Sequence, residues 1–198
     1  MLRRAFVVFT IAATLAAPAL AQETMRVRGA IERIDGSTLY VKTRDGADLK
    51  IALADQPVFT AIIPATLADL KPGTYVGSAA MPGPDGSLSA VEVHIFPEAM
   101  RGTGEGHRPF FIPGSTMTNG TAAGATVMGT DGSAIKVKYK DGEKLIIVPP
   151  NVPIDRYEIG SAADLKTGAA FAVIAATKKP DGSLEAARIN VGRDGVVP

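Results

Sequence analysis

The strongest constraint on the fold is an internal duplication that covers most of the chain. Three segments recur in the same order at offsets of 95 or 96 residues: DGS at 35–37 and 131–133, ADLK at 68–71 and 163–166, and PDGSL at 84–88 and 180–184. The period is too long, and two copies are too few, for a solenoid of stacked repeats. The sequence therefore predicts two tandem domains, residues 22–96 and 122–198, joined by a connector at 97–121.

Within each copy, the apolar residues follow the period of two that is typical of half-buried strands. Leu39, Val41 and Thr43, for example, alternate with polar residues up to an Asp-Gly pair at 45–46. An Asp-Gly pair between such runs indicates a hairpin, because glycine supplies the positive φ of the tight turn. Each copy continues with a short segment of helical character and two more strands. The expected elements are strands at 26–34, 39–43, 49–53, 75–81 and 88–96 with a helix at 65–71, then strands at 126–129, 134–139, 144–148, 170–176 and 184–191 with a helix at 162–166.

This order of elements matches the five-stranded OB barrel. We therefore predict an all-β protein of two tandem five-stranded OB-like barrels (β-β-β-α-β-β each), joined by an ordered glycine-rich connector. The alternative architecture is a pair of open five-stranded sheets packed face to face as a sandwich. A fold of this kind does not by itself define a function.

The N-terminus has the pattern of a secretory signal peptide. Arg3 and Arg4 precede an apolar run at 5–17, and an A-x-A cleavage pattern follows at 19–21. We expect cleavage after Ala21 and a periplasmic or secreted product. The alternative is an uncleaved N-terminal membrane anchor. No later segment is long and apolar enough to span a membrane, so no transmembrane segment is expected after cleavage.

The composition excludes several classes of function. The chain has no cysteine, so disulfides and thiol chemistry are absent. Basic and acidic residues nearly balance, at 21 and 20 in the full sequence, and no nucleic-acid partner is expected. There is no G-x-S-x-G motif for a hydrolytic serine. These features predict a protein that is not an enzyme and has no cofactor.

The connector carries a resemblance to a known family. It contains MRGTGEGHRPFF, followed by PGSTMTN, between Met100 and Asn119. Together with the signal peptide and the two OB-like copies, this segment resembles a family of exported bacterial proteins of unknown function built on OB-like barrels. The resemblance implies export and an OB-like fold, and it implies no particular activity.

Both histidines of the chain lie in or beside the connector. The strand at 88–96 alternates so that Glu92 and His94 face away from its apolar side, and Glu105 and His107 follow in the glycine-rich stretch. Imidazole and carboxylate groups suit zinc or copper(II), and a thioether such as Met100 would suit copper(I). These five residues are the candidate metal ligands.

An alternative interpretation gives the same residues a structural role. Long loops need partners for their backbone groups, and the histidines would hold the connector against the barrels. The spacing matches no established metal motif. In the second copy, Arg188 and Asn190 stand at the places of Glu92 and His94, so the duplication has not kept these groups.

A second candidate site is electrostatic. Lys136, Lys138 and Lys140 alternate with apolar residues on one strand, and Lys42 and Arg44 stand at matching places in the first copy. OB folds often bind oligosaccharides or oligonucleotides over these strands, which suggests an anionic ligand. The alternative is a solvated charged face that discourages edge-to-edge aggregation.

Two aromatic residues of the connector, Phe110 and Phe111, complete the candidates. We expect them to fill an apolar gap between the barrels, with an exposed aromatic binding platform as the alternative. The glycines at 102, 104 and 106 do not form a phosphate-binding loop, because no helix follows them.

These observations together favour an exported, non-enzymatic binding or scaffolding protein of the bacterial cell envelope. Its partner would be an anionic envelope glycan or another envelope protein. The alternative function is a periplasmic copper- or zinc-binding protein that uses the histidines at the junction of repeat 1 and the connector.

Overall fold

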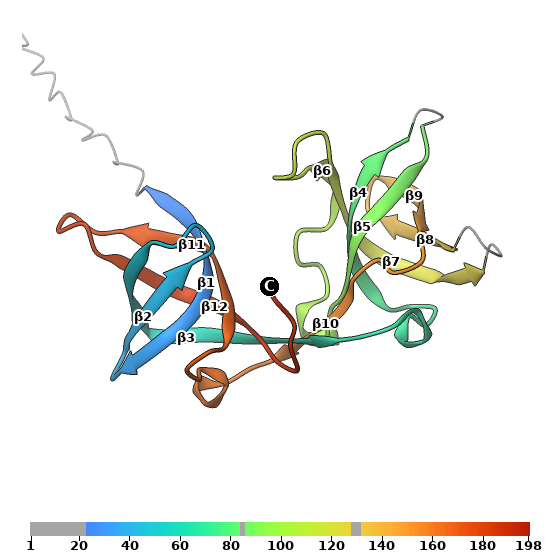
Figure 1. Cartoon of the computed structure of the whole chain (residues 1–198). Coiled ribbons are helices and arrows are strands. Elements are labelled where there is room, and N and C mark those ends of the chain that lie inside the picture. Colours follow the sequence, from blue (N-terminus) through green and yellow to red (C-terminus); the bar gives the residue numbers. More distant parts are fainter. Residues whose placement is uncertain (1–22, 84–85, 128–131) are drawn as a thin grey trace, which may run out of the picture.

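The computed structural model describes residues 23–83, 86–127 and 132–198. The predicted signal peptide lies outside this part. The described residues form twelve strands and three short 3-10 turns, as Figure 1 shows. The strands are β1 (Thr24–Asp35), β2 (Thr38–Thr43), β3 (Asp48–Pro64), β4 (Tyr75–Pro82), β5 (Leu88–Ile95), β6 (Gly106–Pro109), β7 (Thr116–Val127), β8 (Ser133–Tyr139), β9 (Gly142–Val148), β10 (Ile154–Ile159), β11 (Ala170–Lys178) and β12 (Leu184–Gly192). The turns are η1 (Leu67–Asp69), η2 (Glu98–Met100) and η4 (Ala162–Asp164).

The prediction of an all-β protein is confirmed, with four local differences. The two expected helices are single 3-10 turns, because so short a segment cannot support a stable α-helix. The strand expected at 49–53 continues to Pro64, and β6 and β10 were not predicted. The strand expected at 126–129 begins earlier, at Thr116, and residues 128–129 lie outside the described part.

The strands form two lobes. Lobe 1 is a closed barrel in the order β12-β11-β1-β2-β3, with β3 pairing back to β12. Lobe 2 has the order β5-β4-β7-β8-β9, and β9 returns to β5 through two residue pairs, Leu88–Ile146 and Ser89–Ile147. Each lobe encloses its own apolar core, centred on residues such as Leu39 and Phe171 in lobe 1 and Val93 and Ile135 in lobe 2.

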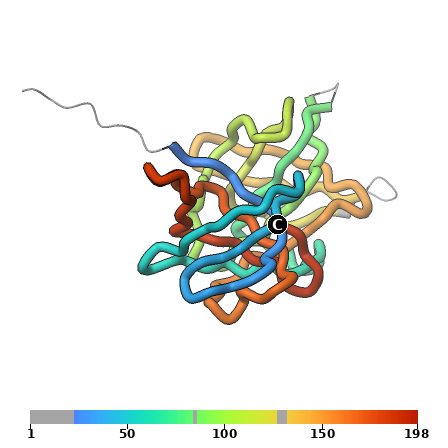
Figure 2. Tube along the Cα trace, turned by 60° about the vertical axis from the view of Figure 1, so that its left-hand side comes forward, coloured from blue at the N-terminus to red at the C-terminus, as the bar shows by residue number. Residues whose placement is uncertain are grey.

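The prediction that each repeat closes its own barrel is wrong, because the repeats exchange their last two strands. The meander β1-β2-β3 of the first repeat is completed by β11 and β12 of the second. The meander β7-β8-β9 of the second repeat is completed by β4 and β5 of the first. In Figures 1 and 2 the blue strands of the first repeat therefore lie beside orange and red strands of the second.

The length of β3 explains the exchange. Its 17 residues extend for about 50 Å at the usual rise of a strand. This length carries the chain out of lobe 1 and into lobe 2 before the next hairpin begins (Figure 1). In the second repeat the same path is divided between β9 and β10.

Strands β3 and β10 cross antiparallel between the lobes and mark an approximate two-fold axis. Thr60 pairs with Ile159, and Ile63 pairs with Arg156. Advancing residues 60 and 63 by the repeat offset of 96 gives residues 156 and 159, so each pair maps onto the other. The two lobes are therefore related as two copies of one exchanged unit.

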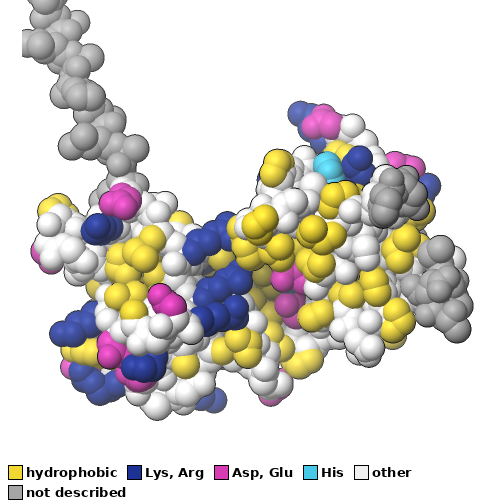
Figure 3. Space-filling view, turned by 45° about the horizontal axis from the view of Figure 1, so that its top comes forward, with side chains coloured by type: hydrophobic (Ala, Val, Ile, Leu, Met, Phe, Trp, Pro, Cys, Tyr) yellow, Lys and Arg dark blue, Asp and Glu magenta, His cyan; other side chains and the backbone are white. Residues whose placement is uncertain are grey.

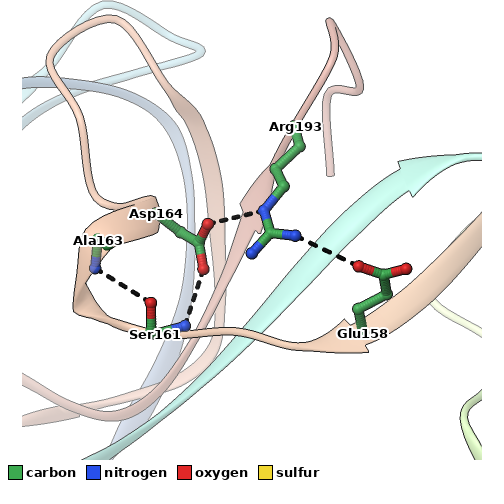
Figure 4. A network of polar contacts seen from close by, with 5 residues as sticks. All are labelled: Glu158, Ser161, Ala163, Asp164 and Arg193. Carbon is green, nitrogen blue, oxygen red and sulfur yellow. Dashed lines mark hydrogen bonds and ion pairs between the residues drawn. The ribbon is translucent and has the colours of Figure 1, made fainter.

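Ion pairs fix the chain where it re-enters each lobe. The turn η4 is capped by Ser161 and Asp164, and Arg193 donates to Asp164 (2.7 Å) and to Glu158 of β10 (3.3 Å), as Figure 4 shows. At η1 the corresponding carboxylate, Asp69, accepts from Arg156 of β10 at 2.6 Å. Both turns are thus tied to neighbouring strands.

The connector is ordered in the structure. It contains η2 and β6, and β6 pairs with the first residues of β7. The carbonyl oxygen of Thr103 accepts hydrogen bonds from the Tyr75 hydroxyl (3.2 Å) and the Asn119 amide (2.9 Å). No helix in the described part of the chain is long and apolar enough to cross a membrane.

Candidate functional site

A cleft of about 500 Å³ lies between the two lobes. Strands β1, β11 and β12 form its lobe 1 wall, and β5, β7, β10 and the connector form the opposite side. Figure 3 shows the hollow, with Lys and Arg side chains on one side, hydrophobic side chains facing them and acidic side chains between. The exchange of strands creates this cleft, because it places the outer face of lobe 1 opposite lobe 2.

Five arginines line the cleft. Arg26 and Arg28 extend from β1, Arg44 follows β2, Arg188 lies on β12, and Arg108 lies on β6 across from them. None of the five forms an ion pair with an Asp or Glu side chain of the described residues. The side chain of Arg44 donates to a main-chain oxygen of Pro198, the last residue of the sequence, and that of Arg108 donates to the backbone carbonyl oxygen of Gly104.

The other four described arginines contrast with this group. Each lies outside the cleft, and each pairs with a carboxylate at 3.3 Å or less: Arg33 with Asp35, Arg101 with Glu98, Arg156 with Asp69, and Arg193 with Asp164 and Glu158. The described arginines without an Asp or Glu partner are therefore concentrated in one place.

The four arginines of lobe 1 form a cationic wall: Arg26, Arg28, Arg44 and Arg188. Arg28 is the most buried of them. Burial, together with the charges of Arg44 and Arg26, lowers the pKa of the Arg28 guanidinium, and Glu92 opposes this effect only in part. A guanidinium stays protonated at neutral pH in any case. The lowered pKa thus reflects burial first and the neighbouring positive charges second, and an anion bound beside Arg28 would oppose both effects.

The opposite surface of the cleft is largely apolar. It includes Phe96, Met100, Phe110, Phe111 and Met117. The Phe111 ring reaches across to lobe 1, where the guanidinium carbons of Arg26 and Arg28 lie 4.7 and 4.8 Å from its centroid. These are cation–π distances, and they place the arginines directly beside an aromatic surface.

A histidine held by two carboxylates forms the floor. Nδ1 of His94 donates to Asp155 at 2.6 Å, and Nε2 lies 3.2 Å from an oxygen of Glu92. Burial alone would lower the pKa of His94, but the hydrogen bonds to Asp155 and Glu92 outweigh it and raise the pKa to about 9. The imidazole is therefore a cation at neutral pH, and the three groups together carry one net negative charge.

The same environment shifts the pKa values of Glu92 and Tyr157, which lie beside His94. Burial pushes the pKa of Glu92 upward, but the hydrogen bond and charge of His94, helped by Arg28, give a net lowering. Tyr157 packs on His94 and Phe96, with ring centroids 5.2 and 5.0 Å away. Burial, then the charges of Asp155 and Glu92, raises the pKa of Tyr157. The phenol consequently remains neutral.

The predicted metal ligands do not meet in one place. His94, Glu92 and Met100 line the cleft, whereas His107 and Glu105 do not. His107 is hydrogen-bonded to Thr118 of β7 (2.8 Å), and burial followed by the charge of Lys144 lowers its pKa.

Glu105 accepts a hydrogen bond from the backbone of Lys140 at 3.1 Å and does not line the cleft. Among the described residues, no group of three or more His, Cys, Asp or Glu side chains is arranged to hold a metal ion.

The predicted ligand-binding residues also lie in different places. Lys136 and Lys138 point out from β8 and pair with Glu143, and Lys42 pairs with Asp48 and Glu32. Arg44, Phe110 and Phe111 line the cleft.

Sequence reasoning missed Arg26, Arg28, Arg188, Asp155 and Tyr157. The alternation of Arg26 and Arg28 on one strand face was a readable signal. The sequence did not show that this face lies opposite lobe 2, so the two arginines could not be recognised as part of a binding site.

Comparisons of the chain with models of protein families, with curated proteins and with solved structures find no match.

Proposed function

We propose that this chain is a non-enzymatic binding protein whose inter-lobe cleft takes an anionic ligand. The observation that carries the proposal is the division of the arginines. All five described arginines that lack an Asp or Glu partner line this one cleft, and all four outside it are paired. Like charges close together repel one another, and an anion bound between these arginines would relieve that repulsion.

The residue type supports an oxyanion ligand. Guanidinium groups bind carboxylate, phosphate and sulfate through two parallel hydrogen bonds, and they do so better than a lysine ammonium. Among the residues that the structure describes, no lysine lines the cleft. The volume of the cleft, about 500 Å³, is in the range of small-molecule sites.

The chemistry of the floor favours binding over turnover. A histidine acts as a general base only in its neutral form, but His94 is protonated between Glu92 and Asp155. Of the described residues that line the cleft, none is a serine or a cysteine, so these two common nucleophiles are lacking there. Together with the predicted signal peptide, these features support an exported binding protein of the cell envelope.

The copper or zinc alternative has less support. It needs His94 and His107 at one place, and only His94 reaches the cleft. Both nitrogens of His94 already face carboxylates, so a metal would have to displace these contacts.

The proposal is tested by isothermal titration of inorganic phosphate, sulfate and acetate into the purified protein at constant ionic strength. We expect saturable binding of at least one anion, weakened about tenfold or more in the double variant Arg28→Ala/Arg188→Ala. Arg33→Ala, which removes a paired arginine outside the cleft, is the matched control and should bind as the parent protein does. Equal binding by the parent protein and the double variant would refute the site.

A further inference from the structure

We propose that the ligand is an anionic amphiphile, in which one acidic oxyanion group is joined to an apolar body. This inference rests on the proposed function and adds the chemical class of the ligand. Its basis is that the cationic wall and the apolar surface of the cleft are adjacent and are both incompletely covered.

The apolar part of the cleft is exposed on both lobes. The side chain of Phe111, on the connector, is 43% exposed, and that of Ile174, on β11, is 44% exposed. Both belong to the lining of the same cleft. Single exposed apolar side chains are common on proteins. Two that face one cavity beside convergent cations are typical of a small-molecule site.

The contact between the arginines and Phe111 indicates that the acidic group and the apolar body of the ligand are directly joined. Arg26 and Arg28 lie against the Phe111 ring, so an anion on these arginines is within one side-chain width of the aromatic surface. An inorganic ion would fill the charged end and leave Phe111 and Ile174 in water. An apolar group attached to the same anion would cover both and gain the free energy of that burial.

The floor limits the ligand to one charged end. Glu92, His94 and Asp155 carry a net negative charge, and the side chain of Glu92 still reaches the cleft. A second anionic group placed there would be repelled. The acidic group of the ligand therefore belongs on the lobe 1 arginines, with the apolar body along Phe111 and Ile174.

The test compares three probes that share parts of this structure: inorganic phosphate, octyl phosphate below its micellar concentration, and 1-octanol. Binding to the whole protein is measured by isothermal titration. We expect octyl phosphate to bind about tenfold or more tightly than inorganic phosphate, and 1-octanol to bind far more weakly than octyl phosphate.

Two sets of variants separate the contributions. Arg28→Ala/Arg188→Ala should weaken both phosphate probes. Phe111→Ala/Ile174→Ser should weaken octyl phosphate about threefold to tenfold more than it weakens inorganic phosphate. Leu145→Ser, at an apolar side chain of β9 that is exposed outside the cleft, is the control. Both cleft side chains are already partly exposed, so these changes should not impair folding.

The possible failures are distinguishable. Equal affinity for octyl phosphate and inorganic phosphate would overturn the amphiphile and leave the anion site standing. Binding of neither phosphate probe would overturn the amphiphile, and if sulfate and acetate also fail to bind, the anion site is overturned as well. Co-sedimentation with phosphatidylglycerol vesicles and not with phosphatidylcholine vesicles would identify a membrane lipid as the source of the expected ligand. Tight octyl phosphate binding without sedimentation would identify a free amphiphile.

Discussion

At the scale of the residue, His94 joins two strands that come from different repeats. Its imidazolium lies between Glu92 on β5 and Asp155 on β10. The pKa of His94 is raised from 6.5 to about 9 in the folded protein, so the charged form is favoured by folding. This contribution is complete below pH 6.5 and is lost as the pH rises through 9. The lowered pKa of Glu92 acts in the opposite sense, and its contribution is lost as the pH falls below the ordinary carboxyl range.

Replacing His94 by asparagine, the residue at the matching place in the second repeat, should remove this dependence. We expect a loss of roughly 3 kcal/mol in the free energy of unfolding at pH 7, because two partly buried carboxylates lose their cation. Urea denaturation at several pH values between 7 and 10 measures both effects. The difference between the parent protein and His94→Asn should shrink toward pH 10. A constant difference across that range would show that the charge of His94 is not responsible.

His107→Asn is the matched control for this variant. His107 makes one hydrogen bond to Thr118 and faces no carboxylate among the described residues at ion-pair distance. Its replacement should cost only about 1 kcal/mol, as for a neutral hydrogen bond. It should not alter the pH dependence above 7.

Two glycines occupy corresponding close contacts in the two lobes. A Cβ atom added to Gly29 would overlap the carbonyl oxygen of Lys42, and one added to Gly120 would overlap that of Lys138. The two lysines are themselves 96 positions apart. In each meander the first strand thus lies so close to the backbone of the second that only a glycine fits at this position.

Gly29→Ala and Gly120→Ala should each lower the free energy of unfolding by roughly 2–3 kcal/mol, since backbone atoms must move to admit the methyl group. Gly36→Ala is the comparison. It has open space around it but a φ of +57°, so its cost is conformational, about 1 kcal/mol. Chemical denaturation of the three variants checks the order. A Gly29→Ala variant as stable as the parent protein would contradict the close approach.

At the scale of the element, the exchanged hairpins link each repeat to the lobe of the other. Val93 of β5 is fully buried in the core of lobe 2, and Ile189, its counterpart in β12, is fully buried in the core of lobe 1. A cavity at either position should weaken the lobe in which the side chain lies, and not the meander that precedes it in sequence.

Hydrogen exchange of Val93→Ala and Ile189→Ala tests this assignment. We expect Val93→Ala to reduce amide protection mainly in β7, β8 and β9, and Ile189→Ala to reduce it mainly in β1, β2 and β3. Each change should cost about 2 kcal/mol or more. The reverse pattern, with Val93→Ala opening β1 to β3, would show that the first repeat folds on itself. The two variants serve as controls for each other.

The sequence was sufficient for the strands but not for their partners. Apolar alternation and Asp-Gly turns are local signals, so most strands were predicted near their observed positions. The hairpins at 75–95 and 170–192 carry the same apolar pattern, and each fits either lobe, so local pattern cannot select the partner. The segment 54–64 lacks regular alternation and contains Pro57. It becomes part of β3 because β10 and β12 supply its hydrogen-bond partners.

The same limit applies to the candidate site. Arg44 was a candidate from its place on a charged strand, whereas Phe110 and Phe111 were expected to fill an apolar gap between the barrels, with a binding platform as the alternative. All three line the cleft. Neither Asp155 nor Arg28 belongs to a sequence motif, so neither was predicted as a site residue. They become neighbours of the cleft only through the crossing of β3 and β10, which is a property of the tertiary fold.

At the scale of the whole molecule, duplication followed by divergence explains how the cleft acquired two unlike walls. Glu92 and His94 in one repeat correspond to Arg188 and Asn190 in the other, and all four line the same cleft. Because the approximate two-fold axis runs between the lobes, corresponding positions face one another. Each substitution that broke the equivalence changed one wall only, which left an acidic floor on lobe 2 and a cationic wall on lobe 1.

The exchange also determines what holds the molecule together when the chain is cut. Of the thirteen strand pairings among the described residues, seven join strands on opposite sides of Pro113 in the connector. We therefore expect that cleavage at a protease site inserted between Pro113 and Gly114, both exposed, leaves the two fragments associated. Separation requires opening both lobes, so it should occur only at urea concentrations that unfold the protein. Native mass spectrometry and size exclusion at high dilution measure the association, and uncut protein with the same insertion is the control. Two fragments that separate in buffer as folded monomers would mean that each repeat closes its own barrel, and that the cleft between the lobes is not built by exchanged strands.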